Sequence, residues 1–248
     1  MPILDPNKSM THHTVSGSRY GFSATRVDAL GAAEWTLVAI ACDVSGSVGG
    51  FEREMEAAIK AVVEACRLSP RADHLMLRTV AFDQRLREVH GFKPLADCHP
   101  TDYDGALAIG GTTALYDAAH NAVAATVQYG AALAQRGMAV NAILFVITDG
   151  GDNASTVDAG AVKHAIAQAV TSEALESVQT LLVGVNVDNT GVGTYLMDFS
   201  AKAGFDHYLA LADATPRTLA GLADFVSQSI AAQSMYLGSG LSATLGTV

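Results

Sequence analysis

Three stretches of the chain are continuous apolar runs rather than alternating ones. They lie at 36–43 (TLVAIACD), 142–149 (AILFVITD) and 178–187 (VQTLLVGVNV), and the first two end in Asp. A strand that is apolar at successive positions is covered on both faces, as in the centre of a parallel sheet. By contrast, 75–83 (LMLRTVAFD) and 86–92 (LREVHGF) are joined by a short polar turn and predict a hairpin nearer the sheet edge.

Segments with the periodicity of a helix lie between these strands. Apolar residues three and four positions apart give one face to a helix that directly follows the first strand, formed by Phe51, Met55, Ile59, Val62, Val63 and Cys66. Further helices are predicted over 115–133 and 157–174, and a last one is marked by Leu219, Leu222, Val226 and Ile230. This alternation predicts an α/β fold that is doubly wound, with a mostly parallel central sheet, one antiparallel edge strand and helices on both faces.

The pattern is weaker at both ends of the chain. Residues 1–33 are mixed and contain Ser, His and Gly, so we interpret them as an N-terminal leader before a single domain over 34–233. Residues 234–248 are apolar, rich in Gly and Ser, and without helical period. This C-terminal tail is either flexible or a strip that awaits a partner.

Composition narrows the function classes. Half of the 248 residues are hydrophobic and 16% are charged, which is typical of a folded domain and not of a disordered chain. The 25 acids against 15 bases give a formal charge of −10, which disfavours binding to nucleic acid or to an anionic membrane and favours cationic partners.

The sequence also predicts a compartment. No apolar stretch approaches the roughly 20 residues that a membrane span needs, and the first residues lack the charged-then-apolar plan of a signal peptide. Cys42, Cys66 and Cys98 form no CxxC pair, and an odd number of cysteines indicates reduced thiols. Cys42 and Cys66 lie in apolar patterns and are expected to be buried. We therefore expect a cytoplasmic protein.

Candidate chemistry gathers where the two Asp-ending strands stop. In a doubly wound sheet the ligand site lies beyond the carboxyl ends of the strands. If the strands that end in Asp43 and Asp149 are neighbours, about 4.8 Å apart, their carboxylates approach each other and require a cation or a proton.

Oxygen side chains surround this point. The loop DVSGS at 43–47 supplies Asp43, Ser45 and Ser47, and the loop IGGTTALYDA at 109–118 brings Thr112 behind paired glycines and before a helix. Carboxylate and hydroxyl oxygens without His or Cys suit Mg²⁺, with Mn²⁺ or Ca²⁺ as other choices.

The motifs DVSGS, GGTT and ITDGGDN, in this order on these elements, resemble the von Willebrand factor type A domain with its metal-ion-dependent adhesion site, over about residues 35–232. The resemblance implies that Asp43, Ser45, Ser47, Thr112 and Asp149 hold a divalent ion directly or through water, with Thr113 as a substitute for Thr112. It also implies an open metal position that takes an acidic group of a partner protein. The ending LADFVSQSIAAQS is similar to the last helix of the tellurite-resistance-associated type, which implies a kinase, a phosphatase or an ATPase as the partner.

Three functions remain open from the sequence. The first is a non-enzymatic, metal-dependent protein-interaction module. The second is a Mg²⁺-dependent phosphatase or phosphotransferase of the haloacid dehalogenase type, although Ser45 stands where such enzymes have their second Asp. The third is a structural scaffold that self-associates through the metal site or the apolar tail.

Overall fold

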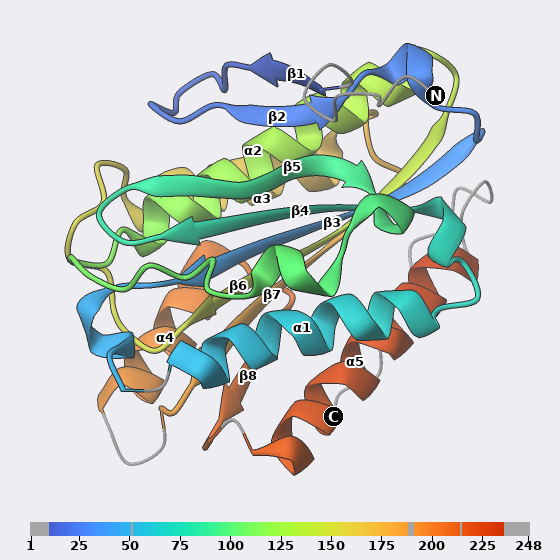
Figure 1. Cartoon of the computed structure of the whole chain (residues 1–248). Coiled ribbons are helices and arrows are strands. Elements are labelled where there is room, and N and C mark those ends of the chain that lie inside the picture. Colours follow the sequence, from blue (N-terminus) through green and yellow to red (C-terminus); the bar gives the residue numbers. More distant parts are fainter. Residues whose placement is uncertain (1–9, 51, 188–190, 214, 236–248) are drawn as a thin grey trace.

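The chain forms a central sheet with helices on both faces (Figure 1). The computed structural model describes residues 10–50, 52–187, 191–213 and 215–235. Within them the strands are β1 Met10–His13, β2 Phe22–Thr25, β3 Glu34–Asp43, β4 Leu75–Phe82, β5 Leu86–Pro94, β6 Ala139–Thr148, β7 Ser177–Val185 and β8 His207–Leu211. Their order across the sheet is β1-β2-β5-β4-β3-β6-β7-β8.

The predicted central strands lie in the middle of the sheet. β3 pairs in parallel with β4 on one side and with β6 on the other, and β6 pairs in parallel with β7. Along β3, Leu37 and Ala39 pack into the core on one face, while Val38 and Ile40 pack into the core on the other. Covering on both faces therefore explains why these runs are apolar at successive positions.

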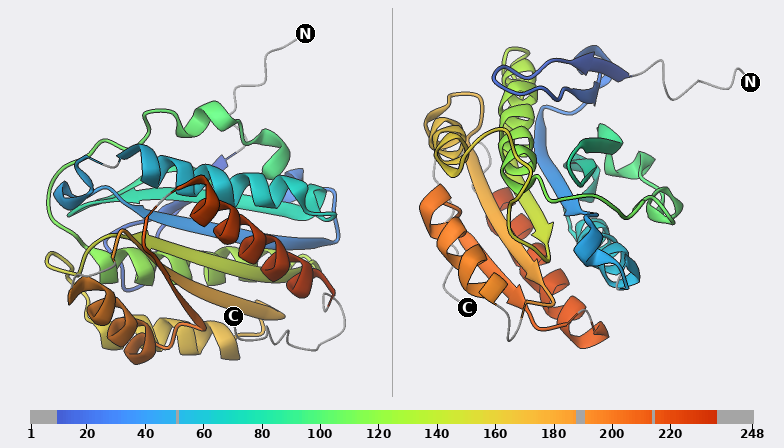
Figure 2. Two further views of the ribbon diagram at one scale, coloured as in Figure 1. Left: turned by 90° about the horizontal axis from the view of Figure 1, so that it is seen from below. Right: turned by 90° about the vertical axis from the view of Figure 1, so that its left-hand side faces the viewer.

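Five helices of the described chain cover the two faces. They are α1 Glu52–Leu68, α2 Leu115–Ala134, α3 Ala159–Thr171, α4 Gly191–Ala203 and α5 Pro216–Met235. α1 and α5 lie side by side on one face, while α2, α3 and α4 cover the other (Figure 2). The doubly wound, mostly parallel architecture is confirmed.

The predicted helix faces are buried where they can be checked. Met55, Ile59, Val62, Val63 and Cys66 of α1 are buried, as are Leu222, Val226 and Ile230 of α5. Phe51 and the side chain of Leu219, assigned to the same faces, lie outside the described residues.

The antiparallel pairing lies toward one edge of the sheet. β5 is antiparallel to β4, as the predicted hairpin requires. Beyond β5 lie β2 and β1, which come from the segment interpreted as a leader, and β1 is the outermost strand. The Tyr129 hydroxyl of α2 donates to the carbonyl of Thr25 in β2 at 2.8 Å, so the β1–β2 pair is attached to α2. The boundary at residues 33 and 34 stays a prediction, and residues 1–9 and 236–248 lie outside the described residues.

Four elements were missed from the sequence, namely β1, β2, α4 and β8. α4 and β8 follow the loop that begins at Asn186, and Leu196, Phe199 and Ala203 form the buried face of α4. Their spacing of three and four is a helical signal that the glycines at 191 and 193 obscured. The helix predicted over 157–174 begins two residues before α3 does. Asp158 is the N-cap of α3, and its side chain accepts a hydrogen bond from the Ala161 N–H.

Candidate metal-binding site

Two acids lie at the carboxyl ends of neighbouring strands. Asp43 is the last residue of β3, and Asp149 directly follows β6. The register that pairs Cys42 with Ile147 brings the two strand ends to the same level of the sheet. The predicted adjacency of these strands is therefore confirmed.

A chain of hydrogen bonds connects the first loop with the second acid. The Ser45 N–H donates to Asp43 Oδ1 at 2.8 Å, and the hydroxyls of Ser45 and Ser47 are 3.0 Å apart. The Ser47 hydroxyl donates to Asp149 Oδ1, also at 3.0 Å. Four of the five predicted ligands thus form one connected group of oxygen atoms.

Asp43 is fully buried, and its charge is costly there. Burial raises the pKa of Asp43 from 3.8 to about 6, although hydrogen bonds from Thr148 and Ser45 oppose the shift, and the nearby charge of Asp149 adds to it. Thr148 Oγ1 donates to Asp43 Oδ2 at 2.6 Å. Burial also raises the pKa of Asp149, which is half-buried, while the hydrogen bond from Ser47 lowers it. A cation between these groups would offset the cost of keeping both acids ionised.

The second loop approaches the first through its glycines. The Gly46 N–H donates to the Gly111 carbonyl at 3.0 Å, and the Gly110 N–H donates to the Val44 carbonyl at 2.9 Å. Gly111 has a φ of 80°, and a Cβ there would lie 1.8 Å from Oε1 of Gln84. The left-handed backbone at Gly111 favours glycine, and any larger residue would also displace the end of the Gln84 side chain.

The two threonines of the second loop have unlike surroundings. Thr112 is exposed, and its N–H donates to Oε1 of Gln84 at 3.0 Å. Thr113 is 3% exposed. A Cβ at Gly150 would lie 3.5 Å from Ser47 Oγ and 3.7 Å from Thr113 Oγ1, so the Thr113 hydroxyl also lies near the group. Thr112 stays the predicted ligand, and Thr113 is the residue to compare with it.

The loop between β6 and α3, residues 149–157 and here called the third loop, is fastened to the first turn of α2. Asn153 Oδ1 accepts from the Thr113 N–H at 2.7 Å, and Asp152 Oδ1 accepts from the Tyr116 N–H at 3.3 Å. Asp152 therefore helps to cap the N-terminus of α2, because the third loop folds back over that end of the helix.

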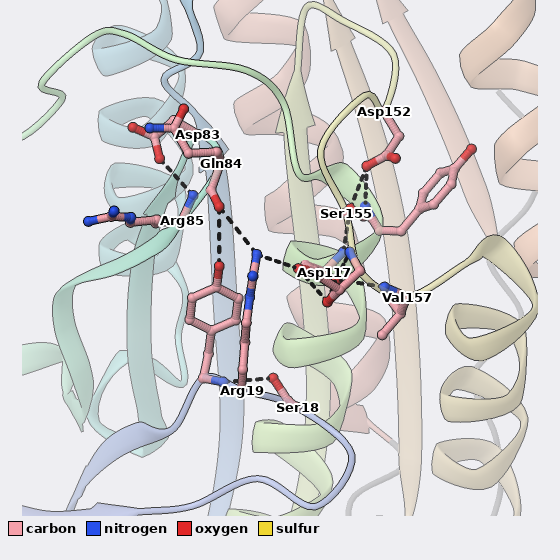
Figure 3. Close-up of polar contacts among 12 residues, drawn as sticks. Ser18, Arg19, Asp83, Gln84, Arg85, Asp117, Asp152, Ser155 and Val157 are labelled. Carbon is pink, nitrogen blue, oxygen red and sulfur yellow. Dashed lines mark hydrogen bonds and ion pairs between the residues drawn. The ribbon is translucent and has the colours of Figure 1, made fainter.

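A buried carboxylate completes this attachment. Asp117 Oδ1 accepts from the N–H groups of Thr156 and Val157 at 2.9 and 3.0 Å, and Asp117 Oδ2 is 3.2 Å from Nη2 of Arg19 (Figure 3). The loop that follows Asp149 is therefore held by α2 and, through the contact of Asp117 with Arg19, by the N-terminal segment.

Two acids of the stretch 97–107 form ion pairs with lysines. Asp102 pairs with Lys93 at 2.7 Å, and Asp104 pairs with Lys60. Across the ranges that the structure describes, no group of three or more His, Cys, Asp and Glu side chains gathers as a metal site. A cation site at Asp43 and Asp149 consequently depends on hydroxyl ligands from serine and threonine.

These donors fit a hard divalent ion. The group offers carboxylate and hydroxyl oxygens at one open strand end, and the side chains range from the buried Asp43 and Ser45 to the exposed Ser47. Oxygen-only donors of this kind suit Mg²⁺, Mn²⁺ or Ca²⁺. The exposed side leaves room for a ligand from outside the chain.

Comparisons with known proteins bear on the fold. The sequence matches no protein-family model and no curated protein. Among solved structures, the PilB minor pilin from Streptococcus sanguinis has a TM-score of 0.57 at 12% identity, covering 83% of this chain and 63% of the pilin. A von Willebrand factor type A protein from Catenulispora acidiphila has a TM-score of 0.55 at 14% identity, covering 89% of this chain and 49% of that protein.

The chain has a von Willebrand factor type A-like fold. Proximal thread matrix protein 1 from the mussel byssus, described with a zinc-occupied MIDAS motif, has a TM-score of 0.52 at 18% identity and covers 80% of this chain. This chain spans 46% of that protein's length and less than two thirds of the other two. At these identities the likeness concerns the fold alone.

Sequence reasoning missed several residues of this candidate site. Thr148 contacts Asp43 because it is the next position in the register after Ile147, and no local signal reveals that pairing. Gln84 comes from the β4–β5 turn, and Asp117 had been counted only as part of a helix. Asp117 lies one helical turn before Asn121 in a face that is otherwise alanine-rich, a polar interruption that could have drawn notice.

Proposed function

We propose that this chain is a non-enzymatic protein-interaction module that depends on a divalent metal ion. The observation that carries the proposal is the hydrogen-bonded group Asp43, Ser45, Ser47 and Asp149 at adjoining strand ends. Mg²⁺ is the proposed ion, and when bound it supplies an open position for an acidic group of another protein. Asp43 and Asp149 hold the charge, and the serines with Thr112 complete the oxygen set.

The surroundings also support a binding role. The site is open at the carboxyl ends of the central strands, where the partner's surface must supply affinity and selectivity. Similar folds occur in a minor pilin and in a thread matrix protein of the mussel byssus, whose names refer to a pilus and to byssal threads. A partner protein with an exposed acid fits best, and self-association is a second arrangement. A kinase, phosphatase or ATPase as the partner rests on the resemblance of the last helix.

A cytoplasmic location is part of the same proposal. Cys42, Cys66 and Cys98 are free and buried, which agrees with a reducing, cytoplasmic environment. No helix in the described part of the chain is long and apolar enough to cross a membrane.

Metal titration of matched variants tests the proposal. We expect Asp43→Asn to lower the Mg²⁺ affinity by roughly a hundredfold or more and Asp149→Asn by about ten- to a hundredfold, because the first removes a buried charge and the second a half-exposed one. Asp198→Asn, an exposed acid of α4, is the control. Isothermal titration gives the affinities, and circular dichroism checks the fold.

Capture of a partner gives the second measurement. The wild type with Mg²⁺ should retain a specific protein from an extract of the source cell, whereas Asp43→Asn and the wild type with chelator should not. Equal capture by folded Asp43→Asn in chelator would contradict the proposal. Phosphatase turnover that disappears in Asp43→Asn would favour the enzymatic reading instead.

A further inference from the structure

A shallow pocket of about 440 Å³ lies beside the candidate metal site. Its lining comes from the N-terminal segment, the β4–β5 turn and the third loop, through Arg19, Tyr20, Gln84, Arg85 and Ala154. Gln84 accepts from the Thr112 N–H at 3.0 Å, and the Ala154 N–H donates to the Thr113 carbonyl at 3.1 Å. The pocket therefore shares its wall with the second metal loop.

The pocket presents mainly hydrogen-bond donors. Arg19 is 48% exposed, its Nη2 contacts Asp117 and the Gln84 carbonyl, and its guanidinium lies over the Tyr20 ring. Its Nε and Nη1 make no hydrogen bond to another described residue. The Arg85 guanidinium has no ion-pair partner in the described part of the chain. Oε1 of Gln84 is taken by Thr112, so the Nε2 amide is its available group. Arg19 and Arg85 lie on opposite sides of Gln84 (Figure 3).

The nearby acids are already engaged. Asp117 is 3% exposed and is held by backbone N–H groups of the third loop. Asp83 accepts from the Arg85 N–H at 2.7 Å and lies 3.8 Å from Nη2 of Arg87. A donor-rich pocket is unexpected on a chain with a formal charge of −10, and its charge complements an acidic ligand.

We propose that this pocket binds a second carboxylate of the same acidic partner protein whose first carboxylate the metal site takes. The inference rests on the proposed function and specifies the partner: an acidic segment with at least two carboxylates, one for the metal and one for Arg19, Gln84 and Arg85. Two anchors explain how a protein with net negative charge selects an acidic partner, because the attraction is local and not general.

A labelled octaglutamate peptide is the probe, with fluorescence anisotropy as the measurement in the presence of Mg²⁺. Arg85→Ala should weaken its binding roughly fivefold, as expected for an exposed charge pair. Gln84→Glu should weaken it about tenfold, because it keeps the acceptor for the Thr112 N–H but replaces the amide donor with a like charge.

Matched controls make the same chemical changes elsewhere. Arg136→Ala removes an exposed Arg just after α2, at the opposite end of this helix from the metal loops. Gln128→Glu adds an acid on the exposed surface of α2. Both should change the affinity for octaglutamate less than about twofold, since charges beyond a Debye length are screened. Circular dichroism shows that each variant is folded.

The outcomes separate this proposal from the proposed function. The proposal that the pocket binds a carboxylate would be contradicted if Arg85→Ala and Arg136→Ala had equal effects on octaglutamate binding and Gln84→Glu and Gln128→Glu did too. A failure of octaglutamate to bind at all would also contradict it. Octaglutamate binding that depends on Arg85 but is the same in Asp43→Asn would support the pocket and contradict the metal-dependent function. Loss of octaglutamate binding in Asp43→Asn, with no effect of the substitutions at Gln84 or Arg85, would support the metal-dependent function and contradict the pocket proposal.

Discussion

The two acids of the site are held in different ways. Asp43 ends a central strand, is completely buried, and has both carboxylate oxygens engaged by Ser45 and Thr148. Asp149 is half-buried at the start of a loop and accepts a hydrogen bond from Ser47. The first acid is therefore positioned by the sheet itself, whereas the second depends on what fastens its loop.

That difference assigns separate tasks to the surrounding residues. The sheet register fixes Asp43 without further help, because both neighbouring strands continue to its level. The loop after Asp149 is fastened by Asp152, Asn153 and Asp117 to the first turn of α2. Changes at Asp43 should thus act through charge, while changes around Asp149 should act through loop geometry.

The largest expected effect is the pH dependence that Asp43 gives to the metal-free protein. Its pKa is raised from 3.8 to about 6 in the folded state, so the folded protein holds this proton more tightly than the unfolded chain does. The stabilisation is fully present below about pH 4 and is lost as the pH rises through about 6, with a total of about 3 kcal/mol. Mg²⁺ should reverse the loss because it binds the ionised carboxylate.

Urea unfolding of the wild type and Asp43→Asn without metal measures this contribution. His90, whose burial lowers its pKa to about 4, gives stability that is lost as the pH falls, but it does so in both proteins. The difference between the two free energies of unfolding isolates Asp43. A difference that stays constant from about pH 4 to about pH 7 would contradict the assigned pKa.

Asp117→Ala should have the next largest effect, on the attachment of the loop after Asp149. It removes the acceptor for the Thr156 and Val157 N–H groups and the partner of Arg19, so we expect a loss of about 2 kcal/mol in the free energy of unfolding. The Mg²⁺ affinity should fall as well, because Asp149 is no longer held in place.

Asp198→Ala, an exposed acid on α4, is the matched substitution and should change stability by less than about 0.5 kcal/mol. Unfolding in urea and titration with Mg²⁺ give both quantities. Unchanged metal affinity in a measurably destabilised Asp117→Ala would show that the loop keeps its geometry without this anchor.

The smallest effect concerns the threonines of the second loop. Thr112→Ala should weaken Mg²⁺ binding by about tenfold through loss of one oxygen ligand. Thr113→Ala should affect stability more than metal affinity, since Thr113 is 3% exposed. Titration of both variants decides between the two hydroxyls, and the opposite order of Mg²⁺ affinities would reassign the ligand to Thr113.

Much of the fold follows from local pattern. The apolar runs at β3, β6 and β7 and the helical spacing in α1, α2 and α5 lie within a few residues of the predicted bounds. The elements that were missed are short or interrupted by glycine: β1 and β2 have four residues each, and α4 begins with Gly191 and Gly193. Such segments carry little periodicity, and their conformation depends on the sheet they join.

The sequence alone determined the alternation of strands and helices and the presence of acids and hydroxyls at strand ends, because both are properties of neighbouring residues. The tertiary structure decided which strands adjoin, so that Asp43 meets Thr148, and it folded the third loop onto α2. It also brought Arg19 from the N-terminal segment beside Gln84 and Arg85. These contacts join residues tens of positions apart in the chain, and only the register and packing of the whole sheet set such distances.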